Sequence, residues 1–207
     1  MYARSTTLQG DAGAVDDLIA YVRDDVMPRA QAADGFVGLS MLCDREAGRC
    51  IVTTAWTTEQ AMRASGEALR DTRTRGAEIL GAPKPEVEQW EIAAMHRVRE
   101  TGDGACVRVI WSQGQAGQVD RILEAWRTTI PSQLEQMAGF CGVSAFVDRA
   151  SGRAVAAVSY ENRDAMARSA ESGLALRDRF AASHGFDISD VAEFDLVLAH
   201  LRLPELV

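Results

Sequence analysis

Residues that bind metals are scarce in this sequence. It has three histidines and four cysteines, and no cysteine lies in a CxxC arrangement. Zinc and iron–sulfur sites need several such ligands at short spacing, so we predict no metal site and no bound cofactor. Cys43 and Cys50 flank six residues and could face each other across a hairpin. We interpret them, with Cys106 and Cys141, as reduced and buried.

Long apolar runs and excess positive charge are absent too. No segment approaches the about 18 consecutive apolar residues that span a membrane, and the N-terminus lacks an apolar signal core. The net charge is −8, whereas nucleic acids and anionic membranes bind basic surfaces. We therefore expect a soluble, cytoplasmic protein without a nucleic-acid or membrane partner.

What the sequence does contain is an internal repeat. A shift of 104 positions places residues 35–62 on 139–166 with 10 of 28 identities, where unrelated segments would share about two. The identities include two glycine-phenylalanine pairs and a repeated turn: Gly35/Gly139, Phe36/Phe140, Gly38/Gly142, Ser40/Ser144, Asp44/Asp148, Arg45/Arg149, Gly48/Gly152, Arg49/Arg153, Ala61/Ala165 and Met62/Met166. We predict a first repeat over 1–98, a linker over 99–105 and a second repeat over 106–207.

Hydrophobic periodicity predicts the same elements in both repeats. An apolar segment over 106–112 indicates a strand, and apolar residues at three- and four-residue steps over 119–130 indicate a helix that Pro131 ends or kinks. A hairpin, a second helix and a last strand follow, the latter over 87–96 and 191–200. The order β-α-β-β-α-β is that of a ferredoxin-like unit.

The last strands are apolar on both faces, in Ile92–Met95 and in Leu196–Ala199, which is typical of a sheet covered on both sides. We therefore predict an α+β fold in which two ferredoxin-like repeats pack sheet to sheet as a pseudo-twofold barrel. This internal pseudo-dimer leaves a further homodimer open. In such a unit the last strand lies beside the first, so His96 should approach Arg4 and His200 should approach Arg108.

Several motifs carry a family resemblance over nearly the whole chain, twice. They are a GFxG start of the second strand, an aromatic strand end before the second helix, and an aromatic-acid-aliphatic last strand: Gly35–Gly38 and Gly139–Gly142, Trp56–Ala61 and Tyr160–Ala165, Trp90–Ile92 and Phe194–Leu196. This pattern resembles the antibiotic-biosynthesis monooxygenase family, whose members are dimeric α+β barrels. The resemblance implies that one chain holds what relatives assemble from two.

That family includes cofactor-free monooxygenases of polycyclic phenols and quinols as well as haem-degrading enzymes. The haem-degrading branch uses an asparagine on the first strand and a tryptophan and a histidine on the second helix. At the matching positions this sequence has other residues, namely Thr6 and Ile110, Ser65 and Ser169, and Thr74 and Asp178. The resemblance therefore does not extend to haem degradation, which needs an axial ligand.

Cofactor-free oxygenation needs a dry apolar cavity, an orienting polar group and in some cases a base. Our candidates for substrate binding are aromatic or lie on the first strand, namely Trp111, Trp126, Trp56, Tyr21 and Thr6. His184 and Tyr160 are candidate catalytic residues. Each has a structural alternative: Trp126 lies on an apolar stripe, Trp56 and Tyr160 occupy equivalent positions, and His184 precedes a glycine that can end a helix.

Two functions remain open at this point. The first is a cofactor-independent monooxygenase-like enzyme, an oxidoreductase that acts on an aromatic or quinol-type small molecule. The second is a non-catalytic barrel that binds a small molecule or serves in a stress response. Both imply a small-molecule ligand.

Overall fold

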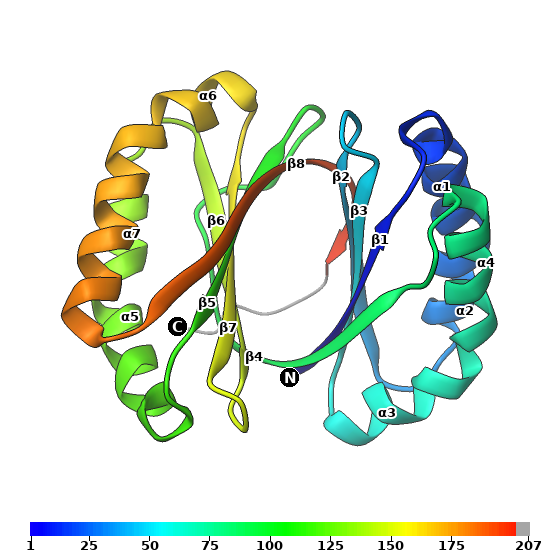
Figure 1. Cartoon of the computed structure of the whole chain (residues 1–207), viewed down its shortest axis with the longest axis horizontal. Helices are drawn as coiled ribbons and strands as arrows, with labels where there is room; N and C mark the ends of the chain where they lie inside the picture. Colours follow the sequence, from blue (N-terminus) through cyan, green and yellow to red (C-terminus); the bar gives the residue numbers. More distant parts are fainter. Residues whose placement is uncertain (202–207) are drawn as a thin grey trace. The chain divides into compact units, whose positions relative to one another are not determined.

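The computed structural model describes residues 1–201 and shows two halves with the same order of elements (Figure 1). Each half has a strand, a helical segment, a hairpin, two helices and a long strand. The first half contains β1 (Tyr2–Gln9), η1 (Ala12–Ala14), α1 (Val15–Tyr21), η2 (Val22–Val26), α2 (Met27–Gln31), β2 (Phe36–Asp44), β3 (Arg49–Trp56), α3 (Glu59–Ala68), α4 (Arg70–Leu80) and β4 (Glu86–Arg97). The second half contains β5 (Cys106–Gln113), η3 (Ala116–Gln118), α5 (Val119–Leu134), β6 (Phe140–Asp148), β7 (Arg153–Tyr160), α6 (Arg163–Arg168), α7 (Ala170–His184) and β8 (Asp187–Leu201).

The chain forms two compact units, and the last strand of each half is divided between them. Unit 1 contains Met1–Trp90 and the end of β8 from Asp195, and unit 2 contains Glu91–Phe194. Antiparallel pairing gives the order β1-β3-β2-β8 in unit 1 and β5-β7-β6-β4 in unit 2. Each sheet therefore includes a strand segment from the other half of the chain. The repeat boundaries at 98 and 106 stay a prediction, and the compact units differ from them at these last strands.

This division corrects the predicted surroundings of the two strand histidines. His96 lies opposite Val143 of β6, and its Nε2 lies 2.7 Å from Oε1 of Glu135. His200 lies opposite Leu39 of β2, and its Nε2 lies 3.3 Å from Nε2 of Gln31. The predicted approach to Arg4 and Arg108 does not describe these partners, and both arginines make their own hydrogen bonds elsewhere, Arg4 to Ser65 and Arg108 to Glu193.

The early part of β4 does lie with its own half. The indole Nε1 of Trp90 donates to Ser5 Oγ on β1 at 2.9 Å, within unit 1. From Glu91 onward the strand belongs to unit 2, where Arg149 donates to the Glu91 carboxylate at 2.6 and 2.9 Å.

In each unit the helices cover one face of the sheet (Figure 1). The apolar stripe of α1 and η2 packs on β2 in unit 1, through Leu18, Val22, Val26, Leu39 and Met41. In unit 2, residues of α5 and α7 pack on β6 and β7, through Ile130, Leu134, Leu176, Phe180, Val143 and Val158. The predicted stripes are thus helix faces in contact with a sheet.

Two details of the helices differ from the sequence prediction. Of the two predicted effects of Pro131, an end or a kink, the end is wrong, because helix α5 continues through Pro131 to Leu134. The predicted second helix is divided in each half, at Leu69 between α3 and α4 and at Ser169 between α6 and α7.

Equivalent contacts recur in both units with the same spacing of 104 residues. Arg4 donates to Ser65 Oγ at 2.9 Å and to the Met62 carbonyl at 2.5 Å. Arg108 donates to the equivalent Ser169 Oγ at 3.4 Å and Met166 carbonyl at 3.1 Å. The two turns also match: Asp44 accepts from the amides of Glu46 and Ala47, and Asp148 from those of Ala150 and Ser151.

The hairpin of unit 1 brings two cysteines together, as predicted. Cys43 of β2 lies opposite Cys50 of β3, and their Sγ atoms are 2.9 Å apart. Both side chains are buried and both thiols are free. In unit 2 the corresponding pair is Val147 and Ala154, which pack in an apolar cluster.

Candidate functional site

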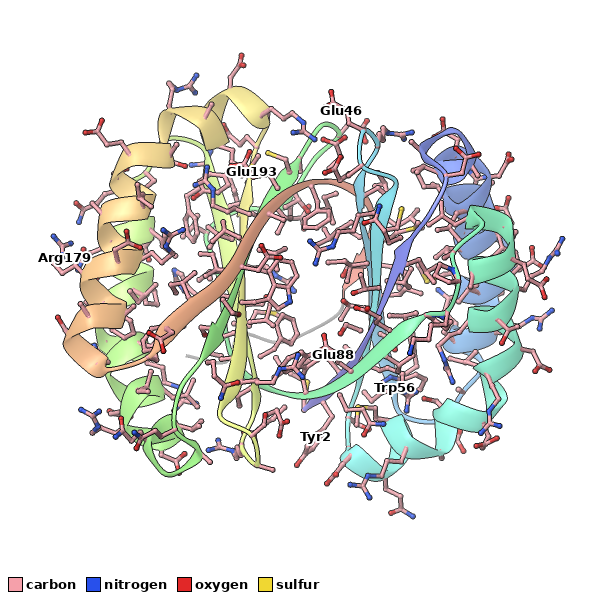
Figure 2. All side chains as sticks on the ribbon, in the orientation of Figure 1. Tyr2, Glu46, Trp56, Glu88, Arg179 and Glu193 are labelled. Atoms are coloured by element: carbon pink, nitrogen blue, oxygen red, sulfur yellow. The ribbon has the colours of Figure 1, made fainter. Side chains whose placement is uncertain are left out.

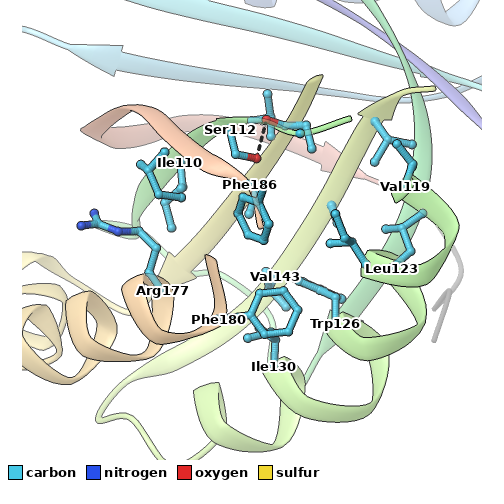
Figure 3. Close-up of a pocket in the computed structure, with 18 of the residues that line it drawn as sticks. Ile110, Ser112, Val119, Leu123, Trp126, Ile130, Val143, Arg177, Phe180 and Phe186 are labelled. Carbon is cyan, nitrogen blue, oxygen red and sulfur yellow. Dashed lines mark hydrogen bonds between the residues drawn. The ribbon is translucent and has the colours of Figure 1, made fainter. Parts of the chain in front are cut away.

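The main cavity of unit 2 lies between its sheet and the two helices α5 and α7 (Figure 3). Its volume is about 130 Å³. The lining comes from β5, β6 and β7 on one side and from α5 and α7 on the other, and the aromatic contributors are Trp126, Phe180 and Phe186. The cavity exists because apolar side chains on alternate strand positions face the apolar stripes of both helices without filling the space between them.

Besides the indole of Trp126, three side chains with polar atoms line this cavity: Ser112, Gln115 and Arg177. The Ser112 hydroxyl donates to the Ala154 carbonyl at 3.4 Å (Figure 3). Gln115 accepts from Gln118 at 3.2 Å at the start of η3. None of the lining residues of the described chain is a histidine, a cysteine or an acid.

Unit 1 has a smaller cavity at the equivalent place, with a volume of about 40 Å³. Tyr21 and Thr6 line it, and the Tyr21 hydroxyl donates to the Thr72 carbonyl at 3.4 Å. Burial raises the pKa of this phenol. The cavity also has more polar lining than that of unit 2, through Arg4, Thr54, Thr72 and Arg73.

Three exchanges between equivalent positions account for much of the difference between the cavities. Gly76 of α4 allows close approach of Leu18, whereas the equivalent Phe180 of α7 is bulky. Leu69 fills space where unit 2 has Gly173, and Ala156 replaces Val52. In unit 2 the bulky Phe180 keeps the helix away from the sheet, and the small residues Gly173 and Ala156 beside it leave the space between them unfilled.

The structure assigns the predicted site residues to different places. Trp126 lines the cavity of unit 2, and Tyr21 and Thr6 line the cavity of unit 1. Trp111 is not among the lining residues; its neighbours Ile110 and Ser112 are, so Trp111 points to the opposite face of β5. There its ring meets Phe194 at a centroid distance of 6.5 Å.

Trp56 and Tyr160 occupy equivalent, fully buried core positions. Trp56 lies on the helix side of the sheet in unit 1 (Figure 2), packs against Met62 and Leu69, and donates to Thr54 Oγ1 at 3.1 Å. Tyr160 packs in the core of unit 2, where the Arg108 guanidinium lies 5.7 Å from the centre of its ring. Burial raises the pKa of Tyr160, which opposes a role as a base at neutral pH.

His184 ends α7 just before Gly185, which has a left-handed backbone conformation. Its Nδ1 lies 2.9 Å from the Phe180 carbonyl, and its ring stacks on the Phe180 ring at 4.2 Å between centroids. The imidazole therefore supports a wall of the cavity from outside the set of lining residues.

Phe180, Phe186 and Arg177 also line the cavity and were not among the predicted site residues. A signal for Phe180 exists, because Leu176 and Phe180 stand four residues apart and so share one face of α7. Phe186 follows the helix-ending glycine and gives no periodic signal.

Across residues 1–201, no three histidine, cysteine or acidic side chains gather where they could hold a metal ion. None of the helices in these residues has the length and apolar character needed to cross a bilayer.

The fold is that of a group of monooxygenase-like proteins. A candidate monooxygenase from Lactobacillus acidophilus matches with a TM-score of 0.70 and 11% identity, over 97% of this chain and 96% of that one. An anthrone oxidase-like protein matches with a TM-score of 0.66 and 14% identity, over 99% and 94%. At such identities the likeness concerns the fold alone. It confirms the predicted class, an α+β chain of ferredoxin-like repeats in the manner of the dimeric α+β barrels.

The sequence itself is related to proteins of Mycobacterium tuberculosis strain H37Rv. The uncharacterized protein Rv2557 is 47% identical over 207 residues, which cover 100% of this chain and 92% of that protein. The uncharacterized protein Rv2558 is 47% identical over 208 residues, which cover 100% and 88%. The chain belongs to the family of these mycobacterial proteins. No model of a known protein family matches the sequence.

Proposed function

We propose that the cavity of unit 2 binds a small, largely apolar molecule with one aromatic ring. The observation that carries this proposal is an apolar void of about 130 Å³. An engineered apolar cavity of about 150 Å³ in another protein stays dry and binds benzene, so this void suits a ligand of one ring. A polycyclic phenol would require the helices to move away from the sheet.

The aromatic lining favours a flat ring as the ligand. Trp126 projects from α5 and Phe180 from α7 into the same space (Figure 3). Aromatic rings prefer offset or edge-to-face contacts, which such a pair of walls can supply to a third ring. The Ser112 hydroxyl can exchange its present bond, which is long at 3.4 Å, for one to a polar substituent on that ring.

Oxygenation of the bound ring is our second candidate function. It is favoured by the fold shared with candidate monooxygenases and by the expected cofactor-free chemistry on an aromatic or quinol-type molecule. The lining supplies no imidazole or carboxylate to take a phenol proton. Binding without catalysis is therefore the better supported of the two functions.

A titration with toluene tests the binding function. Trp126 lies in the cavity, so bound toluene should change its fluorescence and raise the unfolding temperature of the protein. Ala156→Leu fills the cavity and should weaken binding at least about tenfold, by removal of the space for the ring. Val52→Leu, at the equivalent position of unit 1, is the matched control and should bind toluene like the parent chain. Equal binding by both variants would refute the cavity of unit 2 as the site.

Oxygenation requires its own measurement. Hydroquinone and phenol should be incubated with the protein under air, and mass spectrometry should be used to seek a product that has gained one oxygen atom and lost two hydrogen atoms, since the second atom of O2 leaves as water with the substrate's own hydrogens. Product that forms with the parent chain and not with Ala156→Leu supports oxygenation in the cavity. Ligand binding without product supports the binding function alone.

We also propose that the two halves arose by duplication of one unit. Sequence identities, the Arg4 and Arg108 contacts and the two turns all repeat with one spacing of 104 residues. On this proposal the halves serve as the two subunits of an internal pseudo-dimer, and of the two equivalent cavities between sheet and helices that of the second half is the larger.

A further inference from the structure

Two equivalent arginines, Arg73 and Arg177, line the two cavities but differ in what they bind. The Arg73 guanidinium donates to the Gly66 carbonyl at 2.6 Å, a contact between a side chain and the backbone inside unit 1. Burial lowers the pKa of Arg73. Its guanidinium thus serves as a structural donor inside its unit.

Arg177 has no such internal acceptor. Within residues 1–201 its ion-pair partner is the next residue, Asp178, whose Oδ1 accepts a hydrogen bond from Nε at 2.8 Å and lies 2.8 Å from the terminal nitrogen Nη2. The Asp178 side chain is 56% exposed, whereas that of Arg177 is 21% exposed. An ion pair with so exposed a carboxylate contributes little, so it can be exchanged for another anion at small cost.

The position of Arg177 gives it access to a molecule in the cavity. Arg177 is one of the residues that line the cavity, and its guanidinium extends away from Trp126 and Phe180, at the outer edge of the lining residues (Figure 3). The rest of the cavity wall is apolar apart from Ser112 and Gln115. The site therefore has a largely apolar interior, and Arg177 is the one cationic side chain among its described lining residues.

The other arginine close to the cavity is already satisfied. Arg108 lies near Gly173, another lining residue, and donates to Glu193 Oε1 at 2.7 and 3.0 Å. It also donates to Ser169 and to the Met166 carbonyl. Of these two arginines, Arg177 is therefore the one that can exchange its partner, the exposed Asp178 carboxylate, for the anionic group of a ligand.

We propose that the ligand of unit 2 is an aromatic carboxylate of one ring, with the ring in the cavity and the carboxylate on Arg177. The guanidinium fork matches a carboxylate in two parallel hydrogen bonds, which gives direction as well as affinity. Asp178 acts as the competitor that holds Arg177 when the ligand is absent. This inference rests on the proposed binding function and deepens it by naming the ligand class.

Benzoate and toluene form the pair of probes, because they share a ring and differ in the carboxylate. We expect benzoate to bind the parent chain at least as tightly as toluene. Arg177→Gln should lower the ratio of benzoate to toluene affinity about tenfold, as expected for loss of a charged bidentate partner. Asp178→Asn should raise that ratio, because the competing carboxylate is gone. Arg73→Gln is the matched control in unit 1 and should leave the ratio unchanged.

The possible outcomes separate this inference from the proposed function. Toluene binding with a ratio that neither Arg177→Gln nor Asp178→Asn changes would overturn the carboxylate proposal and leave the binding function standing. Binding of toluene but not benzoate would do the same. If neither probe binds, or if Ala156→Leu binds both unchanged, the proposed function fails as well.

Discussion

Arg4 is buried beneath the helices of unit 1, with 5% of its surface exposed. Burial and the nearby Arg73 lower the pKa of Arg4 to about 10. Its hydrogen bonds to Ser65 and to the Met62 carbonyl are what make a buried cation tolerable there. The residue is therefore structural, like Arg108 in unit 2.

Arg4→Met should destabilise the protein by about 2–4 kcal/mol, because it leaves the Met62 carbonyl without its charged donor. Denaturant unfolding measures the loss. Arg23→Met, an exposed arginine beside Asp24, is the control and should unfold like the parent chain. Equal midpoints for both variants would show that the Arg4 contacts add nothing to stability.

Tyr160 should make stability fall at alkaline pH. Burial raises its folded pKa above the ordinary value near 10, so the folded state disfavours the phenolate that the unfolded state accepts. The stabilisation is complete below the unfolded pKa and is lost as pH rises through the folded pKa. Unfolding curves at pH 8 to 11 test this, and Tyr160→Phe should lose less stability over that range. An equal loss of stability between pH 8 and 11 in the parent chain and in Tyr160→Phe would refute this prediction.

At the scale of single residues, the sequence could identify Trp126, Tyr21 and Thr6 as cavity residues, but it could not give the size of either cavity. The reason is that volume depends on combinations across elements. Phe180 opposite small residues leaves space, while Gly76 opposite Leu18 and Leu8 closes it. No single position contains that information.

The type of each element was predictable, but the partner of the last strand was not. Periodicity shows that a segment is a strand, and it does not show which edge the strand joins. The lengths of β4 and β8, 12 and 15 residues, do allow each to run alongside two different neighbours. Length rather than pattern was thus the available signal for the positions of His96 and His200.

The turn glycines give a prediction at the element scale. Gly152 has a φ of +75°, and a Cβ there would overlap the Gly114 carbonyl oxygen. Gly185, which ends α7 with a φ of +71°, has open space around it. Gly185→Ala should cost about 1 kcal/mol for its backbone conformation, and Gly152→Ala at least about 1 kcal/mol more for the clash.

Thermal and denaturant unfolding of the two alanine variants measure this difference. A smaller loss for Gly152→Ala than for Gly185→Ala would contradict the close approach of β5 and the β6–β7 turn. That approach also holds Gly114, whose amide donates to the Gly152 carbonyl at 2.9 Å.

For the whole molecule, the exchanged strand segments predict how a cut chain behaves. Unit 1 needs the end of β8 from Asp195, and unit 2 needs β4 from Glu91. A specific protease site placed in residues 100–104, between β4 and β5, should therefore yield two fragments that elute together in size-exclusion chromatography. They should separate only in denaturant. Separation under native conditions would refute the exchange.

The central claim is that the ligand binds in the cavity between the sheet and the helices of unit 2, and not in the smaller equivalent cavity of unit 1. Methyl NMR during a toluene titration tests it most directly, because both cavities are lined by methyl groups. We predict saturable shifts for Ile110, Leu123, Ile130 and Val143 of unit 2, and none for Leu8, Leu18, Val22 and Val26 of unit 1. Equal shifts in both sets, or no saturable shift in the first, would contradict the claim.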